Sequence, residues 1–321
     1  MEKMQQFDGD VLMINELQRN LESCIYGKSA EINLLLTALL AGGHVLLEDV
    51  PGTGKTVLIR ALSKSIQAQF RRIQCNPDLL PSDITGVSIY HPKTETFQFH
   101  PGPIMTNILL IDEINRATTK TQSALLEAME EEHVTVDGEL YPLPRPFLLL
   151  ATQNPIDFDG TYVLPEAQLD RFMFKFSLGY PDEATECRMA QVQTMARPVD
   201  ELRPVMDNAG LLKIQERVKR LHVDDEVIQY AVSLVRSTRK HPEIRLGASP
   251  RATLALVNAS KAYAYLQGRL FVIPDDVKRL TPFVLGHRLV LETDARLEGK
   301  NAETILEQII RDAKVPVRLE R

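Results

Sequence analysis

The chain has 321 residues, of which 44% are hydrophobic and 25% are charged, as is typical of soluble globular proteins. Acidic residues outnumber basic ones by 43 to 37, which gives a net charge of −6. Without a basic tail or stripe, this balance disfavours a dedicated nucleic-acid binder. The length suggests about two domains.

Three further patterns bear on the compartment and the kind of site. Cys24, Cys75 and Cys187 form no Cys-x-x-Cys pair, which indicates structural thiols in a reducing compartment. The seven histidines show no H-x-x-x-H spacing, which disfavours a zinc site. No apolar run approaches the ~18 residues of a membrane span, and the first ten residues lack an apolar signal core. We therefore expect a cytoplasmic protein without membrane insertion.

Residues 10–41 predict two helices with a break at residues 23–28. The second helix has an apolar face at helical spacing, formed by Ile32, Leu35, Leu36, Leu39 and Leu40. Taken alone, the break at Ile25, Tyr26 and Gly27 is typical of a plain helix–helix turn.

Residues 44–56, HVLLEDVPGTGKT, combine a strand with a glycine-rich turn. The apolar run from His44 predicts a buried strand, and a helical pattern follows from Val57 to about Gln67. Such a turn cradles phosphates, because glycines let backbone N–H groups point inward and the helix N-terminus adds partial positive charge. We expect Lys55 to reach the β- and γ-phosphates and the Thr56 hydroxyl to hold Mg²⁺.

One position departs from the general pattern G-x-x-x-x-G-K-[ST], because this chain has Asp49 where the first glycine would stand. The prediction then depends on the remaining segment, Pro51, Gly52, Thr53, Gly54, Lys55 and Thr56. Ordinary strand–helix turns also contain G-K-T by chance, so other segments have to decide between the two interpretations.

Residues 70–75 predict a second strand, and two β-hairpins are predicted further along the chain. The first pairs residues 87–90 with 96–99, and the second pairs 133–136 with 139–141 through an Asp-Gly turn. Three aromatic residues of the first hairpin either pack together or face a substrate or neighbour: Tyr90, Phe97 and Phe99.

Four aliphatic residues run directly into Asp112 and Glu113. This pattern is typical of a central strand that ends at the carboxyl edge of a parallel sheet, where ligands bind. We expect Asp112 to hold Mg²⁺ beside Thr56 and Glu113 to orient the attacking water. A strand ending in solvated acids is the alternative, but its combination with the phosphate loop favours the functional interpretation.

Thr119 and Gln122 predict a capping box for a helix that runs to about Glu131. Residues 147–151 predict another buried strand, and Asn154 follows it, in a position to bond the γ-phosphate or its water. Asparagine in such a place is otherwise a common turn-former. Residues 173–178 predict the last strand, and beyond Pro181 the patterns are helical. The fold class is therefore α/β, with a core over 1–195 followed by an all-helical lid over 196–321.

Taken together, the sequence resembles the AAA+ ATPases and, among them, the MoxR family. The similarity covers nearly the whole chain, through the ordered segments DVPGTGKT, NPDLLPSDITG, FHPGPI, LLIDEINRA, LLEAMEE, ATQNP, LPEAQLDRF and GASPRA. It implies a P-loop AAA+ core with a parallel sheet and two β-hairpin inserts, followed by an all-helical lid domain. The inserts resemble those of magnesium chelatase and helicase relatives.

The resemblance also implies roles for individual residues. Lys55 and Thr56 would be the Walker A pair, Asp112 and Glu113 would be the Walker B pair, and the segment from Pro51 to Val57 would contact the nucleotide. The other implied roles are Asn154 as sensor 1, Arg251 as sensor 2, Arg171 as the arginine finger that acts on ATP of the adjacent subunit, and Ile25, Tyr26 and Gly27 as adenine contacts. A finger implies a ring, usually a hexamer, and the cofactors would be ATP and Mg²⁺.

Two functions follow from this resemblance. The first is a chaperone-like remodeller or activator of protein complexes, often with a partner that carries a von Willebrand factor A domain. The second is an ATP-driven nucleic-acid motor, because helicases share the hairpin inserts. Lys93 and Arg145 could touch phosphates, but neither hairpin has a cluster of basic residues, so the first function is favoured. A nucleotide-binding scaffold without turnover is disfavoured by the Asp112–Glu113 pair.

Overall fold

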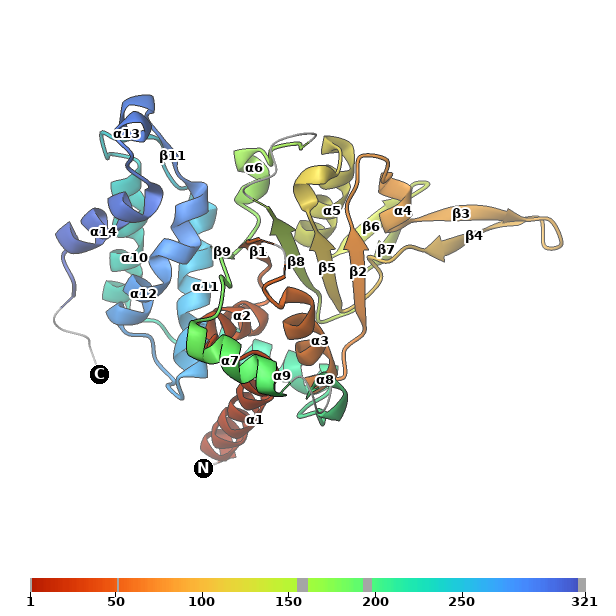
Figure 1. Ribbon diagram of the computed structural model, residues 1–321, viewed down its shortest axis with the longest axis horizontal. Coiled ribbons are helices and arrows are strands. Elements are labelled where there is room, and N and C mark those ends of the chain that lie inside the picture. Colours follow the sequence, from red (N-terminus) through yellow and green to blue (C-terminus); the bar gives the residue numbers. More distant parts are fainter. Residues whose placement is uncertain (1, 51, 155–160, 193–197, 317–321) are drawn as a thin grey trace.

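The computed structural model describes residues 2–50, 52–154, 161–192 and 198–316. Figure 1 shows an α/β core beside a helical lid, with one hairpin projecting from the core on the side away from the lid. Among the described residues, no helix is both long enough and apolar enough to span a bilayer.

In the described part of the chain, five parallel strands form the central sheet in the order β2-β5-β8-β1-β9. The strands are β1 (Val45–Glu48), β2 (Phe70–Gln74), β5 (Ile108–Asp112), β8 (Leu148–Gln153) and β9 (Phe174–Phe176). The predicted parallel sheet is confirmed. Because β5, β8 and β1 are neighbours, their carboxyl ends bring Asp112, Thr152 and the phosphate loop to one edge.

The central strands are apolar throughout because both faces of the sheet are covered. Leu110 and Leu150 face a core shared with the amino-terminal helices and the lid. Leu109 and Leu149 face a second core, formed with the helix and hairpin that follow β5.

Two helices precede the sheet, α1 (Glu2–Cys24) and α2 (Ser29–Ala41), and α3 (Lys55–Ser65) follows β1. The predicted break between the first two helices is confirmed, but α1 begins at Glu2 rather than near residue 10. Likewise α3 begins at Lys55 rather than Val57, because Gly54 adopts the left-handed cap conformation immediately before it.

Both predicted hairpins are present. The first follows α4 (Pro81–Thr85) and consists of β3 (Gly86–His91) and β4 (Thr96–Pro101), and the second consists of β6 (His133–Val136) and β7 (Glu139–Pro142). Tyr90 contacts Phe97 with ring centroids 5.4 Å apart, whereas Phe99 stacks on Tyr141 of the second hairpin at 3.9 Å. The aromatic residues of the first hairpin therefore divide between its own strands and the other insert.

The helix between the inserts, α5 (Thr119–Glu131), follows a 3-10 turn, η1 (Ile114–Arg116). Its capping residue is Thr118, whose side chain accepts a hydrogen bond from the Thr121 N–H, so the predicted Thr119 cap is wrong by one position. Gln122 is buried and donates instead to the backbone oxygens of Ile114, Ala117 and Tyr162.

The remaining elements lead into and build the lid. They are α6 (Glu166–Leu169), α7 (Glu183–Val192), α8 (Pro198–Glu201), α9 (Asn208–Lys219), α10 (Asp225–Thr238), β10 (Ile244–Leu246), α11 (Pro250–Leu266), α12 (Pro274–Leu285), η2 (Gly286–Arg288), β11 (Val290–Leu291), α13 (Thr293–Leu297) and α14 (Ala302–Asp312). The lid is not all-helical, because β10 and β11 pair antiparallel. With three and two residues, these strands are too short to produce an alternating sequence pattern.

The predicted boundary at 195/196 lies outside the described residues. The segment from 198 onward first packs on the core, where Lys64 Nζ donates to the Asp200 carbonyl at 2.5 Å and the Val205 N–H to the Ser65 carbonyl at 2.7 Å. The lid is also joined to α1, since Asp10 accepts hydrogen bonds from Arg217 and Tyr265. The division into 1–195 and 196–321 therefore stays a prediction.

Candidate functional site

The turn between β1 and α3 has the backbone conformation of a phosphate loop. Gly52 and Gly54 have φ of 89° and 88°, in the region that favours glycine, and Gly54 caps α3. A Cβ on Gly54 would lie 3.2 Å from Ile25 Cδ1, so the loop packs tightly against the break between α1 and α2. Pro51 lies outside the described residues.

Asp49, the residue that departs from the general pattern, holds this loop to the end of β9. Its buried carboxylate accepts hydrogen bonds from the Thr53 and Ser177 hydroxyls at 3.0 and 3.1 Å and from the Leu178 and Gly179 N–H groups at 3.0 and 3.3 Å. The missing glycine is thus replaced by a side chain that fixes the loop. No local sequence pattern indicates these partners.

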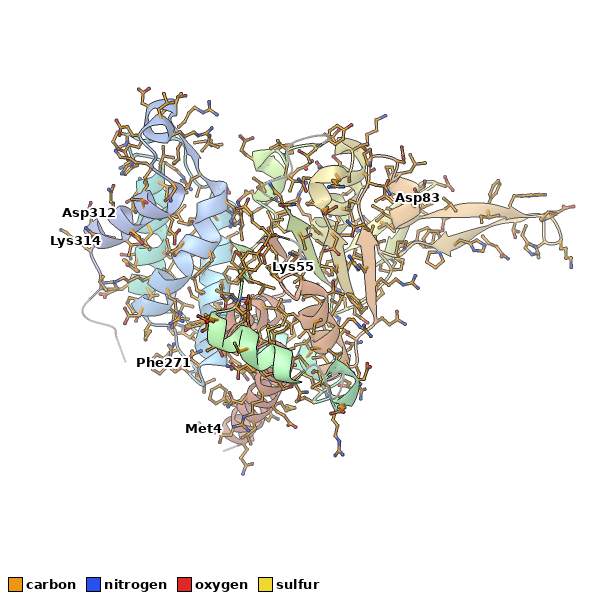
Figure 2. All side chains as sticks on the ribbon, viewed as in Figure 1. Met4, Lys55, Asp83, Phe271, Asp312 and Lys314 are labelled. Carbon is orange, nitrogen blue, oxygen red and sulfur yellow. The ribbon has the colours of Figure 1, made fainter. Side chains whose placement is uncertain are left out.

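Lys55, labelled in Figure 2, is the first residue of α3 and is partly buried. Its ammonium donates to the Val50 carbonyl at 2.7 Å and to the Thr53 hydroxyl at 3.3 Å. Burial lowers the pKa of Lys55, while the nearby carboxylates of Asp49, Asp112 and Glu113 oppose this shift. The structure therefore brings Lys55 together with both acids that the sequence singled out.

Asp112 ends β5 and is buried, with two side-chain partners. Arg72 Nε on β2 donates to Oδ2 at 2.5 Å, and the Thr152 hydroxyl on β8 donates to Oδ1 at 3.2 Å. Arg72 was not predicted as a site residue. It is half exposed, so its pairing with Asp112 leaves the guanidinium open to solvent.

Glu113 adopts φ of 57°, a left-handed conformation that is uncommon outside glycine and that often marks functional sites. The Glu113 N–H donates to the Thr152 hydroxyl at 2.9 Å. On its carboxylate, Oε2 accepts from Gln74 Nε2 at 2.9 Å and pairs with Arg116 at 3.1 Å. The side chain is therefore held between the end of β2 and the 3-10 turn η1.

The residues proposed for Mg²⁺ fit that ion chemically. Thr56 is the second residue of α3 and Asp112 ends β5, so a residue with a hydroxyl and one with a carboxylate lie at the same edge of the sheet. Mg²⁺ is usually bound through one or two carboxylates together with substrate phosphates and water. The described residues contain no group of three His, Cys, Asp or Glu side chains that could hold a metal. This sparse oxygen set is what a nucleotide-bound Mg²⁺ requires.

The segment Ile25–Gly27 lies beside the phosphate loop and near the start of α7. Gly27 has φ of 72°, and a Cβ there would lie 3.1 Å from the Thr185 hydroxyl oxygen. Asp182 caps α7 by accepting a hydrogen bond from the Thr185 N–H, and hydrogen bonds from the Thr185 hydroxyl and N–H lower the pKa of that carboxyl. This places Ile25, Tyr26 and Gly27 next to the loop, whereas Val57, which was also expected to contact the nucleotide, is 40% exposed.

Asn154 directly follows β8, the strand between β5 and β1, as predicted. Arg171 and Arg251 lie together, although the sequence separates them by 80 positions. Both guanidinium groups bind the carboxylate of Glu130 on α5. Sequence reasoning assigned no role to Glu130. The residue expected as sensor 2 therefore shares a carboxylate with the residue expected as the arginine finger.

Comparison with known proteins identifies the family. Residues 44–174 match the model of the ATPase family associated with various cellular activities (AAA), and residues 236–309 match the AAA lid domain. Chaperone MoxR1 of Mycobacterium tuberculosis is 40% identical, over 91% of this chain and 79% of that protein. The chain belongs to the MoxR family of AAA+ ATPases.

Two further relatives extend over nearly all of the chain. YeaC of Bacillus subtilis is 51% identical over 95% of both proteins. The crystal structure of a protein from Cytophaga hutchinsonii that carries a provisional ATPase designation superposes with a TM-score of 0.90 at 37% identity, covering 98% of this chain and 97% of that one. The predicted AAA core and following lid domain are therefore confirmed for this MoxR-family chain.

Proposed function

We propose that this MoxR-family protein binds ATP with Mg²⁺ and hydrolyses it, and that the cycle remodels or activates a protein client. One observation carries the proposal: the glycine-rich loop that leads into Lys55 and the acids Asp112 and Glu113 at the end of β5 lie at the same edge of the parallel sheet. Phosphoryl transfer is catalysed mostly by positioning and by charge neutralisation, and these groups can do both.

Each residue has a distinct task in this proposal. Lys55 and the loop N–H groups hold the phosphates, while Thr56 and Asp112 hold Mg²⁺, which would neutralise charge on the phosphate oxygens when bound. Glu113 accepts a hydrogen bond from the attacking water, and Asn154 orients it. Gln74 and Arg116 both contact Oε2, and a carboxylate has further acceptor sites for that water.

The wider setting is part of the same proposal. The copies would assemble as a ring, most simply a hexamer in the cytoplasm, because Arg171 would serve the neighbouring site. The chaperone name of MoxR1 supports a protein client, and a partner with a von Willebrand factor A domain is the form we propose. A nucleic-acid motor is less well supported, because Arg145 is paired with Glu132.

The test is ATP binding and steady-state hydrolysis of the wild-type protein, Lys55→Ala and Glu113→Gln. Lys55→Ala should weaken ATP binding, whereas Glu113→Gln should bind ATP normally and lose turnover. Equal loss of ATP affinity in both variants would contradict these roles. Hydrolysis that DNA stimulates, with a steep fall as salt rises, would favour the nucleic-acid motor instead.

A further inference from the structure

One carboxylate binds the guanidinium groups of two arginines from different parts of the fold. Arg171 Nε donates to Glu130 Oε2 at 2.8 Å, and Arg251 donates to Glu130 Oε1. Arg171 precedes β9, Arg251 lies in the first turn of the lid helix α11, and Glu130 lies in the last turn of α5. The exposed fractions of these side chains are 29%, 49% and 35%, so an external anion can reach the cluster.

Stability does not explain this arrangement. Ion pairs with this exposure contribute little to folding, because solvent screens them. Two of the charges also lie at the helix ends that disfavour them. The cation of Arg251 lies near the positive end of the α11 dipole, and the anion of Glu130 lies near the negative end of the α5 dipole.

The backbone around both arginines is fixed by a separate, more buried network. The Asp170 carboxylate accepts from Arg288 Nε at 2.7 Å and from the Ser249 hydroxyl at 2.8 Å. Ser249 is the cap residue of α11, two positions before Arg251, and Asp170 directly precedes Arg171. The network therefore joins core and lid and leaves Glu130 to orient the two guanidinium groups.

The cluster retains an uncompensated positive charge, because two guanidinium groups share one carboxylate. Burial and, to a smaller extent, the cation of Arg251 lower the pKa of Arg288, whose own charge is paired with Asp170. Two like charges held side by side at a solvent-accessible place suit an anion with several oxygens, such as a phosphate.

We propose that Glu130 is the positioning residue of an anion-accepting pair formed by Arg171 and Arg251, and that this pair binds a phosphate of the nucleotide held by an adjacent copy. The inference rests on the proposed function. It adds that Glu130 aligns the two cations, which would otherwise repel each other and sample many rotamers. The same geometry places Arg251 with Arg171 on the neighbour's nucleotide.

The test compares Glu130→Gln with the matched control Glu131→Gln, which removes a neighbouring exposed charge from the same helix turn. Glu130→Gln should keep the affinity for Mg-ATP and lower kcat about 10- to 100-fold, because a small misplacement of a charge-stabilising group has effects of this size. Glu131→Gln should keep the wild-type kcat. Turnover of Glu130→Gln within about twofold of wild type would overturn the proposal.

A double variant separates positioning from an independent effect. If Glu130 acts through the arginines, then Glu130→Gln should have no further effect on kcat in an Arg171→Ala, Arg251→Ala background. A further loss of the same factor there would overturn the proposal. Both Gln variants should unfold at about the wild-type temperature, because exposed charges contribute little to the free energy of unfolding.

A wild-type protein without ATP turnover would refute the proposed function, and a second measurement would then decide about Glu130. Sedimentation in the presence of a non-hydrolysable ATP analogue reports whether copies associate through bound nucleotide. Analogue-dependent association that Glu131→Gln keeps and Glu130→Gln weakens would support the positioning role. Equal association of both variants, or no analogue-dependent association of the wild type, would overturn it.

Discussion

Asp49 illustrates how a departure from a motif acquires its own structural role. A glycine at this position would have no side chain, whereas Asp49 fixes Thr53 and the backbone that follows β9. A buried carboxylate is tolerated only when hydrogen bonds replace its lost water, and here four donors do so. The loop keeps its conformation because the remaining glycines provide the positive φ angles.

Gln74 and Arg72 hold both acids at the end of β5. They are two positions apart on β2 and therefore lie on the same face of the strand. In the parallel register, Gln74 lies opposite Asp112. Each of these carboxylate oxygens can accept a further bond, so the β2 side chains can orient both acids while water or metal binds them.

His44 gives the protein a stability that depends on pH. Its ring is buried, accepts from the Leu149 N–H at 3.1 Å through Nδ1, and so donates from Nε2 to the Met129 carbonyl. Burial lowers the pKa of His44 from 6.5 to about 4. The neutral ring is therefore the folded form, and the unfolded chain binds the proton more readily.

The contribution of the neutral His44 ring to the free energy of unfolding is fully present above pH 6.5 and is lost as the pH falls toward 4. The shift corresponds to about 3 kcal/mol of unfolding free energy across that range. Urea unfolding at pH 7.5, 5.5 and 4.5 should show this fall, and His44→Gln should flatten it. His91→Gln, at the exposed hairpin, is the control. An unchanged pH dependence in His44→Gln would assign the effect to other groups.

Some residues of the site were predictable from the sequence, and others were not. Lys55, Asp112 and Glu113 stand in local patterns, because a phosphate loop needs glycines and a buried strand end presents its acids. Glu130 contacts Arg171 and Arg251 across 41 and 121 positions. Such contacts depend on how distant parts of the chain pack together, and no local sequence pattern indicates them.

The β3–β4 hairpin extends away from the body of the protein (Figure 1), and its apolar side chains are unusually exposed. Phe97 is 72% exposed and Ile89 and Tyr90 are each 49% exposed. Its base is anchored by the stacking of Phe99 on Tyr141, so the distal part is free to contact a client or a neighbouring copy.

Shortening this hairpin should separate ATP hydrolysis from client action. Joining Ile89 to Gln98 through Asn-Gly would remove the distal part and keep the Phe99–Tyr141 stack. We expect ATP turnover within about twofold of wild type and a similar melting temperature, because exposed residues contribute little to stability. When the shortened hairpin is combined with Glu113→Gln, the amount of client that co-purifies should fall.

Lys93→Ala is the control for the hairpin, since it keeps the strands and changes only the turn. A second shortened variant at Asp137–Gly138 tests the other insert. If either shortened protein unfolds or melts at a much lower temperature, the aromatic side chains are structural packing and the client role is wrong.

The predictability of the fold also differs between its two halves. The three central strands of the core sheet, β1, β5 and β8, were predictable because buried parallel strands contain runs of apolar residues, whereas the edge strand β2 contains two exposed arginines. In the lid, β10 and β11 were missed, and α1 was assigned too short because its first turns lack a clear apolar face. The hydrogen bonds that Asp10 accepts from Arg217 and Tyr265 span more than 200 positions, and they form only when the lid packs against α1.

Assembly is the property on which hydrolysis should depend most. Lys55 approaches Asp112 and Glu113 within one chain, whereas Arg171 is bound to Glu130 at a different place. We therefore expect Arg171 to complete the site of an adjacent copy. Arg171→Ala should bind ATP nearly normally and hydrolyse it at least about 10³-fold more slowly, the low end of the effect of an arginine finger.

Mixing two inactive variants tests this expectation directly. Lys55→Ala subunits keep Arg171, and Arg171→Ala subunits keep Lys55, so some interfaces in a mixed ring pair an intact loop with an intact arginine. ATP turnover should partly return when the two proteins are mixed under conditions where subunits exchange, and native mass spectrometry would verify the mixed assemblies. Mixed rings without any recovery would count against Arg171 acting on the neighbouring site. An Arg171→Ala monomer with wild-type turnover would eliminate that role, because hydrolysis would then need no second copy.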